Sequence, residues 1–229
     1  MNRPMLAPSM MCVSEWRGAE KTLDQLEEGK IELLHVDVMD GIFVPNLMIG
    51  TESTKNLRKA SHIPLDIHLM IDRPEDKLDW FDIQPGEFVS VHVETTKHLQ
   101  RVLAKIRSYG AKPMAALNPA TPLCMIEEVL DDVDAILLMT VNPGYAGQKL
   151  VPQTLDKIRR LRAMLDESDR ENVLIEVDGN VSFENAVKMR KAGADIFVCG
   201  SSSIFSKGAT VEENIKKFRE CVEIDYDKE

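Results

Sequence analysis

The sequence predicts a closed barrel of eight parallel strands that alternate with helices, the (β/α)8 fold. Short apolar runs recur about every 27 residues, a spacing typical of strand-helix units rather than of hairpins. Amphipathic segments lie between these runs, and several of them are followed by a glycine such as Gly29, Gly110 or Gly193. The chain has 229 residues, and no linker or low-complexity stretch divides it. We therefore expect one barrel domain over residues 1–229.

The strands can be placed in order from their apolar runs. The expected strands are 5–8, 33–38, 65–69, 88–92, 112–117, 135–139, 174–177 and 196–199. The expected helices include 15–28, 96–109, 122–130, 154–166 and 182–192. In such a barrel the functional side chains lie where the strands end.

Composition excludes two classes of protein. Hydrophobic residues make up 44% of the chain and charged residues 29%, the balance of a globular protein. A formal net charge of −10 and the lack of any basic run argue against a nucleic-acid partner. No apolar run is long enough for a signal peptide or a membrane span, so we expect a cytoplasmic protein without a membrane partner. The four cysteines have no metal-site spacing and are expected to be reduced packing residues, with Cys12 as the one candidate reactive thiol.

A polar-apolar-polar pattern occurs near the ends of three expected strands. It reads His-Val-Asp at 35–37, Asp-Ile-His at 66–68 and Glu-Val-Asp at 176–178. Residues two apart on a strand point to the same side, which in a barrel can be the interior. Buried carboxylates and imidazoles must be paired or coordinated. The pattern predicts either a site for Zn, Mn, Co or Fe(II) or a structural polar network, and spacing alone leaves both open.

Glycine-rich turns follow the last three expected strands, at 144–147, 179–180 and 200–203. Glycine lets backbone N–H groups approach an anion, and barrels of this kind often bind a phosphate between their last two strands. A tight turn is the simpler explanation for any one of these loops, but three such loops in succession favour a phosphate-binding site. Met39, Met70 and Met139 also lie at strand ends, where core packing is the commoner role and a water-excluding lining the alternative.

At this point the residues resemble the ribulose-phosphate 3-epimerase family through nearly the whole chain. The motifs that carry the resemblance are APS at 7–9, HVDVMDG at 35–41, FVPN at 43–46, DIHLM at 66–70, NPATP at 118–122, MTVNPG at 139–144, EVDG at 176–179 and GS at 200–201. The resemblance implies a TIM barrel of the ribulose-phosphate-binding type. It also implies a metal-dependent isomerase that inverts C3 of a ketose phosphate through a cis-enediolate, and an assembly of identical copies.

The resemblance also assigns roles to individual residues. It implies one divalent metal ion held by His35, Asp37, His68 and Asp178, with Asp37 and Asp178 as the acid-base pair. The second nitrogens of the two histidines need acceptors, for which Asp66, Glu176 and His92 are candidates. Met39, Met70 and Met139 would line the enediolate. The residues implied to contact the phosphosugar are Ser9, His68, Gly144, Tyr145, Ala146, Gly147, Asp178, Gly179, Asn180, Gly200, Ser201 and Ser202.

Four departures from the family pattern concern the substrate. Members that act on D-ribulose 5-phosphate usually read SILSAD where this chain has SMMCVS at 9–14, GFGG where it has GYAG at 144–147, and DGG where it has DGN at 178–180. The turn GSSSIF at 200–205 is one residue longer. These departures resemble the branch that converts D-allulose 6-phosphate to D-fructose 6-phosphate, which we favour slightly. The alternative is conversion of D-ribulose 5-phosphate to D-xylulose 5-phosphate, because PQTLDK at 152–157 resembles that branch.

Two other classes of function fit the same barrel less well. A phosphosugar lyase generally needs a central lysine, and none stands at a strand end beside the histidines and aspartates. A binding protein without catalysis would be expected to have lost a ligand or an aspartate, yet all four positions are intact. Fold alone does not decide between these classes.

Overall fold

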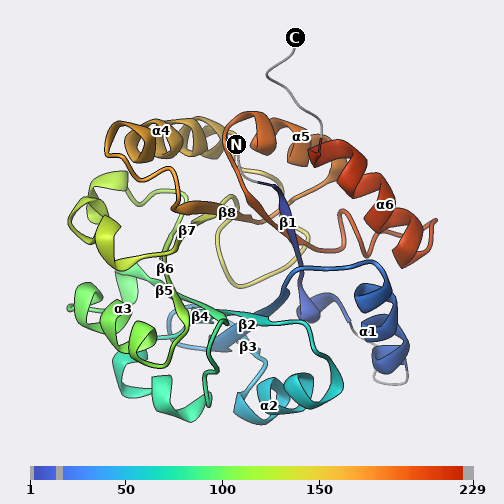
Figure 1. The fold of residues 1–229 in the computed structure, drawn as a ribbon, viewed down its shortest axis with the longest axis horizontal. Coiled ribbons are helices and arrows are strands. Elements are labelled where there is room, and N and C mark those ends of the chain that lie inside the picture. Colours follow the sequence, from blue (N-terminus) through green and yellow to red (C-terminus); the bar gives the residue numbers. More distant parts are fainter. Residues whose placement is uncertain (1–2, 14–17, 224–229) are drawn as a thin grey trace.

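The chain folds into a barrel of parallel strands surrounded by helices (Figure 1). A computed structural model describes residues 3–13 and 18–223. The strands are β1 (Met5–Pro8), β2 (Leu34–Asp40), β3 (Leu47–Met48), β4 (Leu65–Met70), β5 (Phe88–His92), β6 (Lys112–Leu117), β7 (Ala135–Met139), β8 (Leu174–Asp178) and β9 (Ile196–Cys199). The α-helices are α1 (Ala19–Glu28), α2 (Thr51–Ala60), α3 (Leu99–Ser108), α4 (Gln153–Glu167), α5 (Phe183–Lys191) and α6 (Val211–Val222).

Eight of the strands close into a ring. They pair in the order β1-β9-β8-β7-β6-β5-β4-β2, and every pair in this series is parallel. The ring closes where Ser9, just after β1, bridges His35 of β2, and where the Leu33 N–H donates to the Leu6 carbonyl at 3.3 Å. The two-residue β3 pairs antiparallel with the end of β2 and lies outside the ring. The predicted (β/α)8 barrel is confirmed.

The strands are buried on both faces, which explains their apolar runs. On β2, Leu34, Val36 and Val38 belong to the apolar layer between strands and helices, so the alternate residues His35 and Asp37 face the barrel interior. A second apolar cluster fills the interior below them with Phe88, Met114, Ala116, Leu137 and Ile196 among its members. The site therefore rests on a packed core, which holds its strands rigidly.

The expected elements match the structure except in a few places. The segment 122–130 was predicted as one helix, but it forms two 3-10 helices, Leu123–Met125 and Glu127–Asp132. The buried residues Leu123, Ile126 and Val129 recur every three positions, and three residues per turn place all of them on one face. The start of the expected helix 15–28 falls on residues 15–17, outside the described residues. Three strands extend past their predicted ends: β2 ends at Asp40, β4 at Met70 and β8 at Asp178.

Two sequence expectations about the rest of the chain can be compared with the structure. None of the helices in the described residues is long and apolar enough to cross a membrane. All four cysteines are free thiols. Burial raises the pKa of the Cys12 thiol, which makes it a poorer nucleophile and agrees with a packing role.

Candidate active site

Strand register stacks the polar residues of three strands into two layers inside the barrel. On β2 and β4, His35 pairs with Asp66, and Asp37 pairs with His68. Residues opposite each other on neighbouring parallel strands point to the same side, so each pair lies side by side. β8 adds Glu176 to the lower layer and Asp178 to the upper one. The lower layer contains His35, Asp66 and Glu176, and the upper one contains Asp37, His68 and Asp178. The polar-apolar-polar patterns of the sequence produce this arrangement.

His35 of the lower layer reaches the three residues of the upper layer, and one ligand atom from each of the four lies within 4.8 Å of the others. Asp37 Oδ1 lies 3.3 Å from His35 Nε2 and 3.6 Å from His68 Nδ1. Asp178 Oδ2 lies 3.6 Å from His68 Nδ1 and 4.0 Å from His35 Nε2. The four residues predicted as metal ligands thus form one cluster, made of two imidazole nitrogens and two carboxylate oxygens.

The hydrogen bonds of the two histidines show that this cluster fits a metal ion. His35 Nδ1 lies 2.5 Å from Asp66 Oδ2, and His68 Nε2 lies 2.8 Å from His92 Nε2. The inner nitrogens, His35 Nε2 and His68 Nδ1, are buried and have no hydrogen-bond partner among the described residues. A buried nitrogen without a hydrogen bond needs another partner. Two imidazoles and two carboxylates suit a divalent transition metal, which accounts for both nitrogens.

The two aspartates of the cluster have opposite pKa shifts. Burial, together with the neighbouring charge of Asp37, raises the pKa of Asp178 to about 7. Burial acts in the same direction on Asp37, but His35 and His68 outweigh it and hold the pKa of Asp37 well below its ordinary value. Burial also opposes the charged form of His35, yet Asp66 and Asp37 keep the pKa of His35 well above its ordinary value. At neutral pH one aspartate is therefore ionised while the other titrates.

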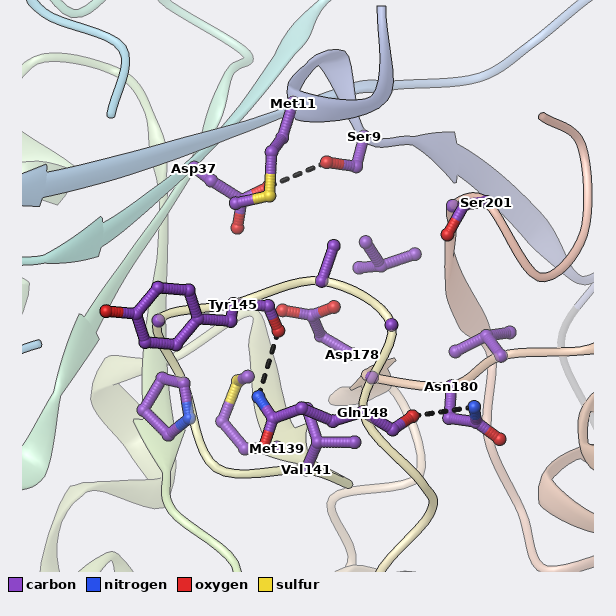
Figure 2. Close-up of a pocket in the computed structure, with 18 of the residues that line it drawn as sticks. Ser9, Met11, Asp37, Met139, Val141, Tyr145, Gln148, Asp178, Asn180 and Ser201 are labelled. Atoms are coloured by element: carbon purple, nitrogen blue, oxygen red, sulfur yellow. Dashed lines mark hydrogen bonds between the residues drawn. The ribbon is translucent and has the colours of Figure 1, made fainter. Parts of the chain in front are cut away.

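A cavity opens above this cluster, and most of the predicted contact residues line it (Figure 2). Asp37 projects into it from β2 and Asp178 from the end of β8, while the Ser9 hydroxyl donates to Asp37 Oδ2 at 2.7 Å. The other predicted residues that line it are Met39, Met70, Met139, Gly144, Tyr145, Ala146, Gly147, Gly179, Asn180, Gly200, Ser201 and Ser202. His68 differs from the prediction, because it is fully buried and is not among the lining residues. It therefore contacts the aspartates rather than the cavity.

The glycine-rich loops after β7, β8 and β9 form one wall of the cavity. Gly144, Gly147 and Gly179 have φ angles of +121°, +79° and +117°, which residues with a side chain rarely adopt. Asn180 has φ of 49°, the left-handed conformation that asparagine tolerates, and its Nδ2 donates to the Gln148 carbonyl at 2.7 Å. Asparagine can therefore occupy a position where the resemblance leads one to expect glycine.

Two loops meet across the mouth of the cavity. The Asn46 side chain donates to the Gly144 carbonyl at 2.9 Å, and the Tyr145 hydroxyl donates to the Pro45 carbonyl at 2.5 Å. Gln148 Nε2 donates to the Tyr145 carbonyl at 2.9 Å and thereby closes the loop that follows β7 (Figure 2). These bonds connect the segment after β2 to the segment after β7, although the two are about a hundred residues apart in sequence.

Methionines line the inner wall of the cavity. Met39, Met70 and Met139 are 4%, 1% and 2% exposed, and Met39 and Met70 pack with Val44 in a small apolar cluster that Met11 also contacts. The sequence had not singled out Met11 or Gln148 as site residues, although both line the cavity. The only signal for them was their position, two residues after Ser9 and one after Gly147.

Comparison with known proteins agrees with this geometry. The model of the "Ribulose-phosphate 3 epimerase family" matches residues 5–205. A ribulose-phosphate 3-epimerase of Bacillus subtilis is 41% identical over 197 residues, covering 86% of this chain and 90% of the relative. One of Escherichia coli K12 is 41% identical over 204 residues, covering 88% of this chain and 89% of the relative.

Solved structures with similar folds are more distant in sequence. KGPDC of Streptococcus mutans has a TM-score of 0.67 at 12% identity and covers 97% of this chain and 98% of its own. The 3-hexulose-6-phosphate synthase of Salmonella typhimurium has a TM-score of 0.65 at 15% identity, and the match covers 95% of this chain and 98% of the synthase. At this identity the likeness shows the barrel alone. From the family match over 5–205 and the identity to curated relatives, the chain belongs to the ribulose-phosphate 3-epimerase family, whose members are isomerases that act on carbohydrates.

Proposed function

We propose that this chain interconverts the C3 epimers of D-ribulose 5-phosphate and D-xylulose 5-phosphate. One observation supports the reaction above all others: two carboxylates, Asp37 and Asp178, project from different strands into one cavity and have opposite pKa shifts. The curated relatives carry the name of the five-carbon reaction, so they favour this substrate over the D-allulose 6-phosphate that the departures in sequence had favoured.

Inversion of a carbon next to a ketone needs a base on one face and an acid on the other. In our proposal the ionised Asp37 removes the C3 proton from one epimer, and the protonated Asp178 returns a proton to the opposite face. The reverse reaction exchanges these roles. The opposite pKa shifts show that the two carboxylates have different surroundings, which suits two groups that carry out opposite proton transfers. The Ser9 hydroxyl, which donates to Asp37 Oδ2, holds the first carboxylate in orientation.

The four clustered side chains are proposed to hold one divalent cation, Zn, Fe(II), Mn or Co. His68 Nδ1 would supply its lone pair, His35 Nε2 would do so after losing the proton that Asp66 and Asp37 favour, and Asp37 and Asp178 would supply one oxygen each. When bound, such a cation acts as a Lewis acid and stabilises negative charge on substrate oxygens. Asp66 accepts a hydrogen bond from His35 and so fixes the direction of that ring.

The remaining cavity residues are proposed to hold the substrate and to exclude water. Met39, Met70 and Met139 place polarisable apolar surface beside the aspartates, so a planar enediolate there would be shielded from solvent protons. Backbone N–H groups of the loops at 144–147, 179–180 and 200–202 would hold the phosphate. No lysine or arginine is among the described residues that line the cavity, which also argues against a lyase that depends on a lysine.

Two of the departures from the family pattern, Tyr145 and Asn180, are compatible with the five-carbon substrate. The Tyr145 side chain is 55% exposed and its hydroxyl bonds to Pro45, so a tyrosine in place of phenylalanine alters the joined loops rather than the cavity floor. Asn180 takes the left-handed conformation that glycine would take. Neither departure therefore argues against the five-carbon substrate.

The proposal is tested by turnover assays run side by side on D-ribulose 5-phosphate and D-allulose 6-phosphate. We expect kcat/KM to be higher for the five-carbon substrate, to be lost on chelation, and to return with a divalent cation. A higher kcat/KM for D-allulose 6-phosphate would overturn the substrate assignment. Equal activity before and after chelation would overturn the metal role.

We also propose that residues 1–229 act as one catalytic domain, in the cytoplasm, in an assembly of identical copies. Ile42 and Leu47, in the segment after β2, are 71% and 74% exposed, and exposed apolar side chains can lie in an interface between copies. Light scattering of the purified chain checks the assembly, and a monomer at micromolar concentration would contradict it.

A further inference from the structure

His68 differs from His35 in the partner of its outer nitrogen. His35 bonds to the carboxylate of Asp66, whereas His68 Nε2 lies 2.8 Å from a second imidazole nitrogen, His92 Nε2. The two rings are nearly coplanar, with an angle of 23° between them and centroids 5.0 Å apart. A hydrogen on either nitrogen therefore points at the other. Both rings are fully buried, so water does not supply an alternative partner.

On its other side His92 faces a carboxylate. His92 Nδ1 lies 3.2 Å from Glu94 Oε2. The second oxygen of Glu94 accepts from the Asn118 N–H at 3.0 Å and from the Thr121 hydroxyl, both in the NPATP segment at 118–122. This segment has no part in the proposed chemistry, and its contacts hold the Glu94 carboxylate toward His92.

The groups within hydrogen-bond distance favour one order of the hydrogens along this chain, since Glu94 bonds to His92 whereas Asp37 and Asp178 lie beyond that distance from His68 Nδ1. A carboxylate beside His92 Nδ1 requires a hydrogen there, and burial disfavours a second proton on the same ring. His92 Nε2 is then a bare acceptor, so the facing His68 Nε2 must carry the hydrogen. A neutral imidazole has only one N–H, which leaves a lone pair on His68 Nδ1. That lone pair faces Asp37 and Asp178 at 3.6 Å each.

We propose that Glu94 is a positioning residue which, through His92, fixes the tautomer of His68 and so keeps His68 Nδ1 free to bind a metal ion. Phe43 packs against the His92 ring with centroids 4.7 Å apart and helps to keep that ring facing His68. The inference rests on the proposed metal role of His68 and adds two residues to it. It also gives the NPATP segment a role, namely orientation of Glu94.

The first test is the tautomer of each ring in protein from which metal has been removed. The chain has five histidines, so their ring nitrogens can be assigned by 15N NMR. We expect His92 as the Nδ1–H tautomer and His68 as the Nε2–H tautomer. Detection of His68 as the Nδ1–H tautomer would overturn the proposal without any assay of activity.

The second test uses Glu94→Gln, whose amide can either donate to His92 Nδ1 or accept from it. We expect mixed tautomers of His92 and His68, and about a tenfold weaker affinity for Co2+ measured by visible absorption, the loss typical when the partner of a ligand histidine is removed. Glu184→Gln is the matched control, since Glu184 is an exposed residue of α5 that bonds to Lys188. Thermal unfolding verifies that both variants are folded.

The outcomes separate this inference from the proposed function. Native tautomers and Co2+ affinity within twofold of wild type in Glu94→Gln would overturn the positioning role, even if the enzyme epimerises ketose phosphates. Conversely, the expected tautomers and the tenfold loss would support that role even in a protein that epimerises neither substrate, a result that overturns only the proposed function.

Discussion

At the level of residues, Asp37 and Asp178 should be the least replaceable side chains of the chain. We predict that Asp37→Asn and Asp178→Asn each lower kcat by at least about 10²–10⁴-fold, since each removes one proton-transfer group and one proposed metal ligand. Circular dichroism should show the fold retained. Asp79→Asn is the control, because Asp79 lies on the surface beside Lys105 and Tyr109. Near-normal turnover in either site variant would refute the two-base assignment.

Gly179 is the glycine whose replacement should cost most. A Cβ at this position would lie 2.5 Å from Val141 Cγ2 and 2.8 Å from the Val141 nitrogen, and φ is +117°. Gly86 is a matched control with φ of +86° and nothing within 4 Å of its Cβ position. We predict that Gly86→Ala lowers the unfolding free energy by about 1 kcal/mol and that Gly179→Ala lowers it by about 1–3 kcal/mol more. Equal losses in urea unfolding would contradict the close contact with Val141.

The sequence predicted which residues come together at the candidate site but not all of their contacts. Spacing of two on a strand predicted that His35 and Asp37 share a side, and the structure stacks them in the barrel interior. Asp66 and His92, two of the three candidate partners for the histidines, do contact them, but the pairing of His92 with His68 could not be predicted, because it depends on which nitrogen of each ring faces the other. That follows from the register of β4 with β5 and from the ring orientations, which no residue spacing encodes.

At the level of elements, the two loops joined over the cavity should control substrate binding. Tyr145→Phe removes the hydroxyl that donates to the Pro45 carbonyl and leaves the ring. A single hydrogen bond contributes about 0.5–1.5 kcal/mol, so we predict a KM for D-ribulose 5-phosphate about 2–10-fold higher with kcat little changed. Steady-state kinetics measures both constants. An unchanged KM would show that the loops do not depend on this bond.

α4 is anchored to the NPATP segment by a buried lysine. Lys157 Nζ donates to the Asn118 carbonyl at 2.8 Å, and burial lowers the pKa of Lys157 to about 8. In the unfolded chain the pKa of lysine is about 10.4, so between these values the unfolded state holds a proton that the folded state has lost. The unfolding free energy should therefore rise with pH in this window, by at most about 1.4 kcal/mol per unit.

Lys157→Met provides the reference for this pH dependence, because methionine does not titrate. Urea unfolding at pH 8, 9 and 10 should show wild type gaining stability relative to Lys157→Met as the pH rises. Parallel curves for the two proteins would contradict the lowered pKa of Lys157.

Element positions could be predicted where burial determines the pattern of apolar residues along the chain. All eight barrel strands lie at the expected runs, because strands buried on both faces are short apolar segments whatever their neighbours are. The segment 122–130 was wrong in helix type, since a spacing of three between Leu123, Ile126 and Val129 also fits an α-helical face. The two-residue β3 could not be predicted, because its pairing with Met39 and Asp40 arises from the folded loop.

At the level of the whole molecule, the net charge of −10 is compatible with an anionic substrate. The described residues that line the cavity include no lysine or arginine, so the phosphate is expected to bind to backbone N–H groups of three loops. Local backbone dipoles at one rim of the barrel can attract a phosphate although the surface as a whole is acidic.

The central claim is that this barrel exchanges the C3 proton of a ketose phosphate with solvent through two carboxylates. It is tested most directly by incubating D-ribulose 5-phosphate and D-xylulose 5-phosphate with metal-supplied protein in D2O and following C3 by NMR. We predict that deuterium enters C3 of both epimers as they interconvert, and that Asp37→Asn and Asp178→Asn prevent the interconversion. Full retention of hydrogen at C3 with unchanged epimers, under conditions in which the protein is folded and a divalent cation is present, would contradict the account.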